Sequence, residues 1–336
     1  MNILNLIYIL LVFGIIIAFH EFGHFVMAKK NGILVKEFAI GMGPTLWSTK
    51  KKETKYSLKA LPIGGYCLML GEDEESEDEN AFSNKSVWAR MSVVLAGPVF
   101  NFILAFVFSI VLISIVGFDA ANINAVNKDS AAYEAGIKAG DEIISMDGKR
   151  IYNYREVLVY MQFHQTGEPM DITVDREGNR INYTITPKKS ENGVYQIGVT
   201  GGVREKGNAI ATIKYAGLEL RYWVVTTFES LKQLFTGRIG IDSLSGPVGI
   251  GKMMNDTIEE ANDTGGAIDV VLNIVNFCIL LSANLGVMNL LPIPALDGGR
   301  FLFLIIEAVR RKKVSVNVEA VVNVVGFVLI MLLMVF

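Results

Sequence analysis

Four stretches with almost no charged residues constrain this chain more than any other feature of its sequence. They run from Ile3 to Ala28, from Met91 to Phe118, from Val270 to about Leu291 and from about Glu319 to Phe336. A helix needs about 20 apolar residues to cross a bilayer, and each stretch approaches or exceeds that length. The 336 residues are 51% hydrophobic and 19% charged, which is too apolar for an ordinary soluble protein. We therefore expect a polytopic α-helical membrane protein with four transmembrane helices.

The distribution of lysine and arginine predicts the orientation of these helices. Short loops rich in basic residues face the cytoplasm, and here they follow the first and third stretches. The basic residues are Lys29, Lys30, Lys36, Lys50, Lys51, Lys52, Lys55, Lys59, Lys85 and Arg90 in one loop, and Arg300, Arg310, Arg311, Lys312 and Lys313 in the other. Both termini and the long segment 119–269 are then extracytoplasmic. The N-terminus has no signal-peptide pattern, so the first stretch is expected to remain as a helix.

Charge and cysteine content exclude two other classes of protein. The net charge is -3 and no basic stripe dominates the sequence, which argues against nucleic acid as the main partner. Cys67 and Cys278 are the only cysteines and lie on different segments, so a disulfide framework is not expected. The acidic run from Glu72 to Glu79 is interpreted as a solvated loop, as most blocks of like charge are.

The first cytoplasmic loop contains a predicted β-hairpin. Two β-like stretches, EFAIGMGPTLW and KYSLKALPIGGYCLML, flank the polar turn STKKKET between Glu37 and Leu70. The hairpin is rich in glycine, including Gly64 and Gly65, and its apolar content suggests that it enters the membrane beside protein or a wet cavity. Its edge could then pair with an unwound peptide. The alternative is a cytosolic hairpin that lies on the surface.

The extracytoplasmic segment begins with a compact module. The sequence EAGIKAGDEIISMDGKRI, a helical stretch and a hairpin with an EGN turn together resemble a PDZ domain of the bacterial, circularly permuted kind, over about Asn122 to Val199. The resemblance implies an α+β fold with a groove that takes a peptide end or strand. Beyond it, Ala209 to Phe235 is amphipathic, with Tyr222 and Trp223 suited to a helix at the membrane interface.

The sequence HEFGH inside the first apolar stretch points to a metal site. His20 and His24 are four residues apart, so on a helix they share one face, and two imidazoles so placed can hold one tetrahedral zinc ion. Glu21 can then act as general base on a water molecule. Charged or ligating groups at membrane depth are costly, which suggests a functional site. The structural alternative is that these polar residues tie helices together by hydrogen bonds.

A catalytic zinc ion usually takes three protein ligands, so a third must come from elsewhere. Topology favours the segment Asn289 to Arg300, which lies at the same membrane face as the two histidines. Its two prolines must break the helix and let Asp297 turn inward. Asp297 could instead be the N-cap of the next apolar helix. His164 is expected at the surface of the outer module, and Glu37, Glu53 and the acidic run remain possible on spacing alone.

With these motifs the chain resembles the site-2 protease family of intramembrane metalloproteases. HEFGH and the downstream Asn-x-x-Pro-x-Pro-x-Leu-Asp-Gly-Gly carry the resemblance, and a single PDZ module makes it similar to the bacterial regulator-of-sigma-E protease (RseP-like) branch. GPVFN (97–101) and GPVGI (246–250) also look like family motifs. The resemblance implies His20, His24 and Asp297 as ligands of one Zn²⁺ and Glu21 as catalytic base.

The resemblance also implies roles for residues around the zinc site. Asn289 is implied as a substrate-backbone contact or an aid to the oxyanion, although its amide could equally join two helices. Asn101 is expected to be structural. The hairpin with Gly64 and Gly65 corresponds to an element that holds substrate as an extended strand.

The implied activity is that of a zinc metalloendopeptidase in the bacterial inner membrane. Its substrates would be single-span membrane proteins, such as anti-sigma factors or remnant signal peptides. The expected organisation is two helices with the hairpin (1–118), the PDZ domain (119–200), an interfacial helix and linker (201–269), and two final helices (270–336). The PDZ domain would exclude substrates with bulky outer domains. A variant without residues 122–199 that still rejects substrates with intact, bulky outer domains would refute this filter.

Two other functions are weighed against proteolysis. In a membrane adaptor the PDZ module would recruit peptides around a structural metal, but such a metal needs a fourth ligand and neither cysteine lies near either motif. A metal-ion transporter needs polar residues along a path through several spans, and the second and fourth stretches offer almost none.

Overall fold

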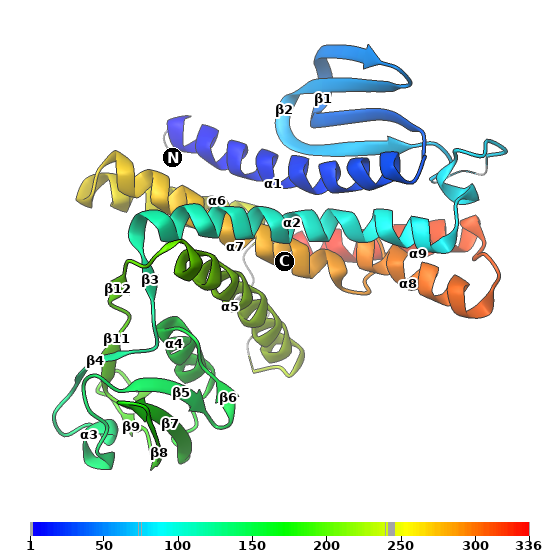
Figure 1. Cartoon of the computed structure of the whole chain (residues 1–336). Helices are drawn as coiled ribbons and strands as arrows, with labels where there is room; N and C mark the ends of the chain where they lie inside the picture. Colours follow the sequence, from blue (N-terminus) through cyan, green and yellow to red (C-terminus); the bar gives the residue numbers. More distant parts are fainter. Residues whose placement is uncertain (1–2, 73, 75, 239, 241–245, 336) are drawn as a thin grey trace. The chain divides into compact units, whose positions relative to one another are not determined.

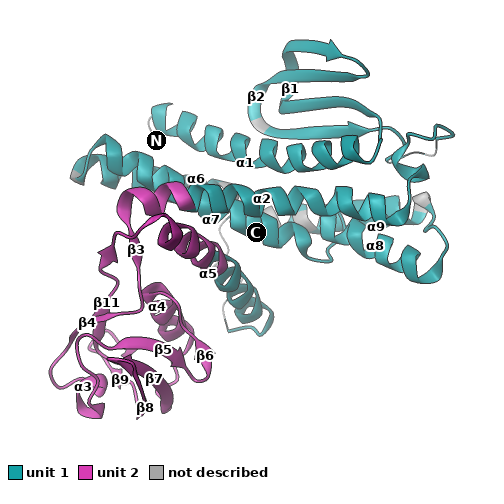
Figure 2. Cartoon of the chain, viewed as in Figure 1, with its two compact units in different colours: residues 1–109, 223–336 teal, residues 110–222 magenta. Residues whose placement is uncertain are grey.

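The computed structural model describes residues 3–72, 74, 76–238, 240 and 246–335. The chain forms two compact units (Figure 2). The first, which we call the helical unit, comprises residues 1–109 and 223–336, and the second, which we call the outer module, comprises residues 110–222. Each unit is described by itself.

Apolar helices make up most of the helical unit (Figure 1). The helices that lie in it wholly or in part are α1 (Ile3–Lys30), α2 (Val87–Val116), α5 (Ala209–Phe235), α6 (Pro247–Thr264), α7 (Ala267–Leu290), α8 (Asp297–Arg310) and α9 (Val316–Val335). Among the described residues, α1, α2 and α7 are long and apolar enough to cross a membrane. This confirms a helical membrane fold. The fourth predicted span corresponds to α9, whose described apolar stretch is the shorter Val318–Leu329, so the count of four stays a prediction.

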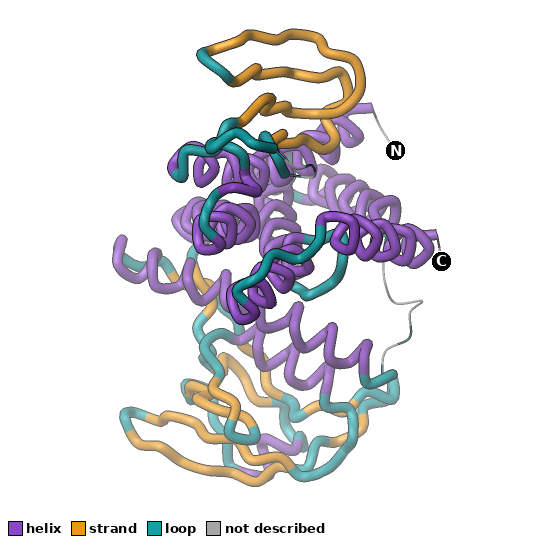
Figure 3. The backbone as a smooth tube through the Cα atoms, turned by 90° about the vertical axis from the view of Figure 1, so that its right-hand side faces the viewer, coloured by secondary structure: helices purple, strands orange, loops and turns teal. Residues whose placement is uncertain are grey.

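The predicted hairpin forms, but it is folded back on itself. β1 (Val35–Lys51) and β2 (Thr54–Met69) pair antiparallel around a tight turn, and Ala39 is matched both to Tyr66 and to Ser57. The first half of β1 therefore lies between two segments of β2, a path visible in Figures 1 and 3. No described strand pairs with the other edge of residues 65–69. The outer edges of the small sheet, residues 65–69 and residues 45–51, therefore have no strand partner among the described residues.

The hairpin packs along α1. A Cβ on Gly14 would lie 2.7 Å from the carbonyl oxygen of Pro62, and one on Gly65 would lie 3.6 Å from Cγ of Glu21. Buried side chains of both elements also share one hydrophobic cluster, which includes Ala28, Val35 and Cys67. The hairpin thus runs beside a helix that is apolar enough to span a membrane.

The acidic loop after the hairpin is mainly solvated, as expected. The described residues from Glu74 to Glu79 are exposed or half-buried. Glu72 differs because its side chain is only 15% exposed and forms an ion pair with Arg300. A short 3-10 helix, η1 (Phe82–Asn84), then leads to α2. The solvated-loop interpretation therefore holds for most of the run but not for its first residue.

The outer module is an α+β domain with its own core. Its main sheet has the order β6-β5-β7-β8 and packs with two helices around apolar residues such as Ile143, Ile172 and Val174. The EGN turn is confirmed between β7 and β8, where Glu177 and Gly178 both have positive φ, as the tightest hairpin turns require. The elements are β3 (Phe118–Asp119), β4 (Ile123–Val126), α3 (Ala131–Ala135), β5 (Glu142–Met146), β6 (Lys149–Arg150), α4 (Tyr154–Phe163), β7 (Met170–Arg176), β8 (Asn179–Ile185), β9 (Lys188–Lys189), β10 (Tyr195–Gln196), β11 (Val199–Gly201) and β12 (Arg204–Glu205).

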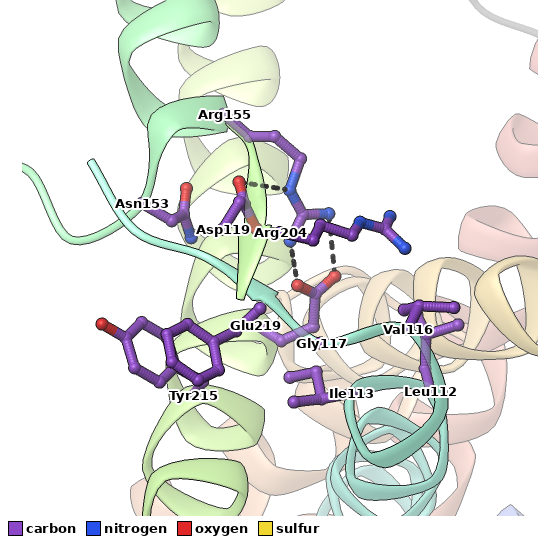
Figure 4. A pocket seen from close by; sticks show the side chains of 11 residues that line it. Leu112, Ile113, Val116, Gly117, Asp119, Asn153, Arg155, Arg204, Tyr215 and Glu219 are labelled. Carbon is purple, nitrogen blue, oxygen red and sulfur yellow. Dashed lines mark hydrogen bonds and ion pairs between the residues drawn. The ribbon is translucent and has the colours of Figure 1, made fainter. Parts of the chain in front are cut away.

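Arginine–carboxylate ion pairs tie this module together. Arg176 on β7 binds both carboxylate oxygens of buried Asp141, at 2.6 and 2.7 Å. Burial alone would raise the pKa of Asp141, but the hydrogen bonds from Arg176 and the Lys138 backbone hold this pKa below its usual value. Arg155 on α4 lies between Asp119 and Glu219 and pairs with both (Figure 4). The Arg176 pair holds β7 to the residue before β5, and the Arg155 pairs fasten α4 to β3 and α5, which lead into and out of the module.

The amphipathic helix predicted from Ala209 to Phe235 is confirmed as α5. Within it, Tyr222 is buried, and the guanidinium carbon of Arg155 lies 4.6 Å from its ring centroid. The second helix of this region, α6, was not predicted; it begins with the proline of the GPVGI motif, which suits the first turn of a helix. A lower hydropathy than that of the spans explains why this helix was missed.

Candidate active site

Helix α1 carries the HEFGH motif on the face that it buries. Its apolar sequence contains no proline, and its buried positions recur every three or four residues, which keeps one side against its neighbours. They are Asn5, Ile9, Val12, Ile16, His20, Gly23, His24 and Ala28. Because His20 and His24 belong to this set, both imidazoles point into the protein interior, at 7% and 8% exposure.

The break between α7 and α8 supplies the third side chain. Helix α7 ends at Leu290, and Leu291 already has extended backbone, as expected before Pro292. Helix α8 then begins with Asp297, and its N-cap is Leu296. Asp297 is therefore not the N-cap, and its carboxylate turns toward the two histidines.

Three potential ligand atoms converge at this point. Nε2 of His20 and Nε2 of His24 are 3.2 Å apart, and Oδ2 of Asp297 lies 3.1 Å from the first and 3.5 Å from the second. Among the described residues this is the one group of three His, Cys, Asp or Glu side chains close enough to hold a metal ion. Burial alone would raise the pKa of Asp297, but the two imidazoles hold it below its usual value. A carboxylate binds a metal ion in its ionised form.

The geometry of these atoms fits a zinc ion. Ligand atoms about 2.0–2.1 Å from zinc at tetrahedral angles are about 3.3–3.4 Å from one another, which matches the three separations above. Oδ2 of Asp297 is also buried and makes no hydrogen bond to any described residue. A buried carboxylate oxygen without a donor is costly, and a cation at the centre of the three atoms would satisfy it.

Two glycines allow the helices to approach this closely. A Cβ on Gly23 of α1 would lie 2.4 Å from the carbonyl oxygen of Ala96, and one on Gly97 of α2 would lie 2.4 Å from Nε2 of His24. Gly97 also leaves room for Cε1 of His20, at 2.6 Å from the same imagined Cβ. The glycine of the GPVFN motif is therefore part of the wall against which both imidazoles lie.

Gly97→Ala is expected to weaken zinc binding by roughly one order of magnitude, since overpacking a well-packed site costs about 1–3 kcal/mol. Competition with a chromophoric chelator measures the change. Gly251→Ala is the matched control, because a Cβ on this helical glycine of α6 meets only Cγ2 of Ile9, at an ordinary 3.9 Å. Equal zinc affinity of the two variants would contradict the role given to Gly97.

The three atoms face a cavity of about 260 Å³. Its walls come from α1, β2, the loop after β2, α2, the end of α7 and the segment at the start of α8, and its polar groups include Glu21, Glu72, Asn289 and Arg300. A water molecule occupies about 30 Å³ in the liquid, so several can enter beside Glu21. The ion pair of Glu72 with Arg300 joins the loop after the hairpin to α8 at this cavity.

The predicted substrate-binding residues lie at different distances from the centre. Nδ2 of Asn289 is 3.5 Å from Nε2 of His20, and Gly65 lies beside Glu21. Gly64 has a φ of +86° and faces the side chain of Met42 instead. The structure thus brings Asn289 to the cavity and Gly65 beside Glu21, whereas Gly64 lies within β2 against Met42.

Of the alternative third ligands, Glu37, Glu53 and His164 lie elsewhere, whereas Glu72 of the acidic run lines the cavity but is not one of the three converging ligand groups. Glu37 accepts a hydrogen bond from Ser57 and pairs with Lys55, and Glu53 is exposed in the turn of the hairpin. His164 stacks on Tyr160 in the outer module, with ring centroids 3.9 Å apart. Sequence reasoning missed Gly97 and Arg300 as residues of the site and considered Glu72 only as one member of the acidic run. The GPVFN motif could have identified Gly97, but nothing in the sequence distinguishes Glu72 from the other acidic residues of its run.

Comparison with known proteins agrees with this geometry. The model of Peptidase family M50 matches residues 8–333. The chain belongs to peptidase family M50. This confirms the predicted site-2 protease family and its RseP-like branch.

Curated relatives align with nearly the whole chain. A Clostridium acetobutylicum protein named "Putative zinc metalloprotease" is 39% identical over 337 residues, covering 100% of this chain and 96% of its own. The regulator of sigma-W protease RasP of Bacillus subtilis is 32% identical over 412 residues, covering 97% and 95%. Among solved structures, the PDZ domain of an SdrC-like protein from Listeria monocytogenes matches at 22% identity over 26% of this chain and 87% of its own, with a TM-score of 0.22.

Proposed function

We propose that this M50 peptidase is an intramembrane zinc metalloprotease, which hydrolyses a peptide bond in or near the transmembrane segment of single-span membrane proteins. The observation that carries the proposal is the convergence of His20, His24 and Asp297 at tetrahedral spacing on a helix apolar enough to span a membrane. The zinc metalloproteases among its relatives agree with this choice of metal.

In this proposal His20, His24 and Asp297 hold one zinc ion. Bound there, zinc supplies a Lewis acid that polarises the scissile carbonyl and makes a water molecule easier to deprotonate. Glu21, which lines the same cavity, takes a proton from the attacking water and passes it to the leaving amine. The Asn289 amide, near His20, can donate a hydrogen bond to the charge that develops on the carbonyl oxygen.

The hairpin is proposed to hold the substrate. A transmembrane helix hides its carbonyls in internal hydrogen bonds, so it must unwind before cleavage, and each unpaired backbone group in lipid costs several kcal/mol. The free edge of residues 65–69 offers replacement bonds by strand addition. Gly65 and Cys67 of this strand border the Glu21 side chain and the cavity, respectively, which puts a bound strand within reach of the catalytic groups.

The outer module is proposed to be the PDZ domain that filters substrates by the size of their outer domains. The basic residues of the two loops predict that it and both termini are extracytoplasmic, in a bacterial inner membrane, with the site near the cytoplasmic face. A structural metal in a membrane adaptor is disfavoured, because no fourth protein ligand joins the group among the described residues.

Metal removal tests the proposal. Purified full-length protein in liposomes should cleave a membrane-anchored reporter, lose the activity after treatment with a zinc chelator and regain it on addition of one equivalent of Zn²⁺. The matched control is a reporter whose transmembrane segment is replaced by a soluble linker, which should resist cleavage. Cleavage that survives removal of zinc would refute the proposal, and equal cleavage of both reporters would refute its intramembrane part.

A further inference from the structure

The side chain of Asn101 on α2 is fully buried beside His20. Its exposure is 0%, and its Nδ2 lies 3.1 Å from Nδ1 of His20. Its Oδ1 is buried and has no hydrogen-bond partner among the described residues. A buried amide in this condition costs about 1–3 kcal/mol. Its presence in the wall of the site therefore requires a reason beyond helix packing.

The role of His20 as a metal ligand supplies that reason, because a ligand imidazole needs its proton on a particular nitrogen. To bind a metal through Nε2, the neutral imidazole must carry its proton on Nδ1, and Nδ1 then needs an acceptor. His24 has one, since its Nδ1 lies 2.8 Å from the carbonyl oxygen of Val93, which can only accept. The corresponding partner of His20 is Asn101.

The side-chain amide of Asn101 can form a hydrogen bond with either tautomer of His20. With Nδ2 toward the ring, the amide donates to Nδ1, and the ring proton must sit on Nε2, where it blocks metal binding. Rotation of the amide by 180° exchanges its N and O atoms without changing its shape. Oδ1 then accepts from Nδ1–H, and the lone pair of Nε2 faces the other two ligand atoms.

We propose that Asn101 is a positioning residue that selects the metal-binding tautomer of His20 through its side-chain carbonyl oxygen. The inference rests on the proposed function and goes beyond it by giving a role to the last residue of the GPVFN motif. Gly97 and Asn101 are four residues apart and share one face of α2. One makes room for the two imidazoles, and the other orients the first of them.

The backbone of Asn101 also takes part in helix packing, and this contact allows a matched control. Oγ of Ser282 on α7 donates a hydrogen bond of 2.9 Å to the carbonyl oxygen of Asn101. Ser282→Ala removes this contact between the two helices but leaves the amide of Asn101 and the imidazole of His20 in place. It therefore reports what packing alone contributes at the same position.

Two substitutions of Asn101 separate positioning from packing. Asn101→Leu keeps the approximate volume and removes the acceptor, so zinc should bind 10–100-fold more weakly, the usual effect of losing such a partner. Asn101→Asp keeps an acceptor and cannot donate, so it should bind zinc at least as tightly as the parent chain. A merely structural asparagine would make both substitutions harmful, and the aspartate more so because it buries a charge.

We would measure the zinc affinity of the full chain in detergent by competition with a chromophoric chelator. The visible spectrum of the protein loaded with Co²⁺ serves as a second readout. Thermal unfolding of each variant identifies any loss of fold. The expected order of affinity is Asn101→Asp equal to or above the parent, Ser282→Ala within about threefold of it, and Asn101→Leu well below.

Three results would overturn the inference: parental affinity in Asn101→Leu, a tenfold loss in Asn101→Asp, or a loss in Ser282→Ala as large as that in Asn101→Leu. If the Asn101→Leu variant fails to fold, the zinc affinity of Asn101→Asp still tests the inference. A parent chain that binds no zinc would instead refute the proposed function, so the two failures are distinguishable.

Discussion

Glu21→Gln is expected to lower the cleavage rate of a membrane-anchored reporter by about 10²–10⁴-fold while the protein keeps one equivalent of zinc. General acid–base catalysis contributes that much to typical enzymes, and glutamine has nearly the shape of glutamate but accepts no proton. The side chain of Glu21 is not one of the three converging ligand groups, so its charge should matter little for metal affinity. Metal content and reporter turnover are measured on the same preparation.

Glu72→Gln is the matched control for this prediction. Glu72 is another carboxylate of the same cavity, but its partner is Arg300. Its loss should change turnover by less than about tenfold, since partly exposed ion pairs contribute only about 0–1 kcal/mol. If Glu21→Gln retained parental turnover, Glu21 could not be the catalytic base; if both variants lost it equally, the negative charge of the cavity would be the essential property.

Asp297→Asn is expected to weaken zinc binding by about two to three orders of magnitude. Zinc sites with four ligands bind with about 10–16 kcal/mol, or roughly 2.5–4 kcal/mol per ligand, and a neutral amide replaces the anionic ligand poorly. Fold stability should change little, because Asp297 is not the N-cap of α8 and a charge in the first turn contributes only about 0.3–1 kcal/mol. Zinc titration and thermal unfolding of the metal-free form separate the two effects.

The control for Asp297 is Glu319→Asn, which removes an acidic residue from the first turn of α9. It should leave zinc affinity unchanged. An Asp297→Asn protein that binds zinc as tightly as the parent chain would exclude Asp297 as a ligand. It would also leave the two histidines without a carboxylate partner and remove the geometric basis of the proposed protease.

The sequence predicted those features that depend on local pattern. Hydropathy identified α1, α2 and α7, and HEFGH placed two imidazoles on one helical face because a four-residue spacing fixes that geometry. The prolines at 292 and 294 predicted the end of α7, which the structure has at Leu290. Asp297 could be paired with the histidines before the structure was known, because the predicted topology put both ends at the same membrane face.

The features that could not be predicted arise from contacts between distant segments. Nothing local distinguishes Glu72 from the acids that follow it, since its partner Arg300 is 228 positions away. The second half of β2 returns to pair with the first half of β1, and this pairing likewise depends on contacts that the local sequence does not reveal. Asn101 was expected to be structural, and only the distance to His20 and the unpaired Oδ1 point to the positioning role proposed above.

The separation of the site residues along the chain also bears on how the protein is made. His20 and Asn289 are 269 positions apart, and Asp297 comes later still. At a synthesis rate of about 5–20 residues per second, roughly 15–50 s pass between them. During that interval the nascent chain holds a helix with two histidines and a glutamate but no complete centre. Under the proposed function, a newly inserted copy therefore cannot cleave neighbouring membrane proteins until the segment that carries Asp297 has been synthesised.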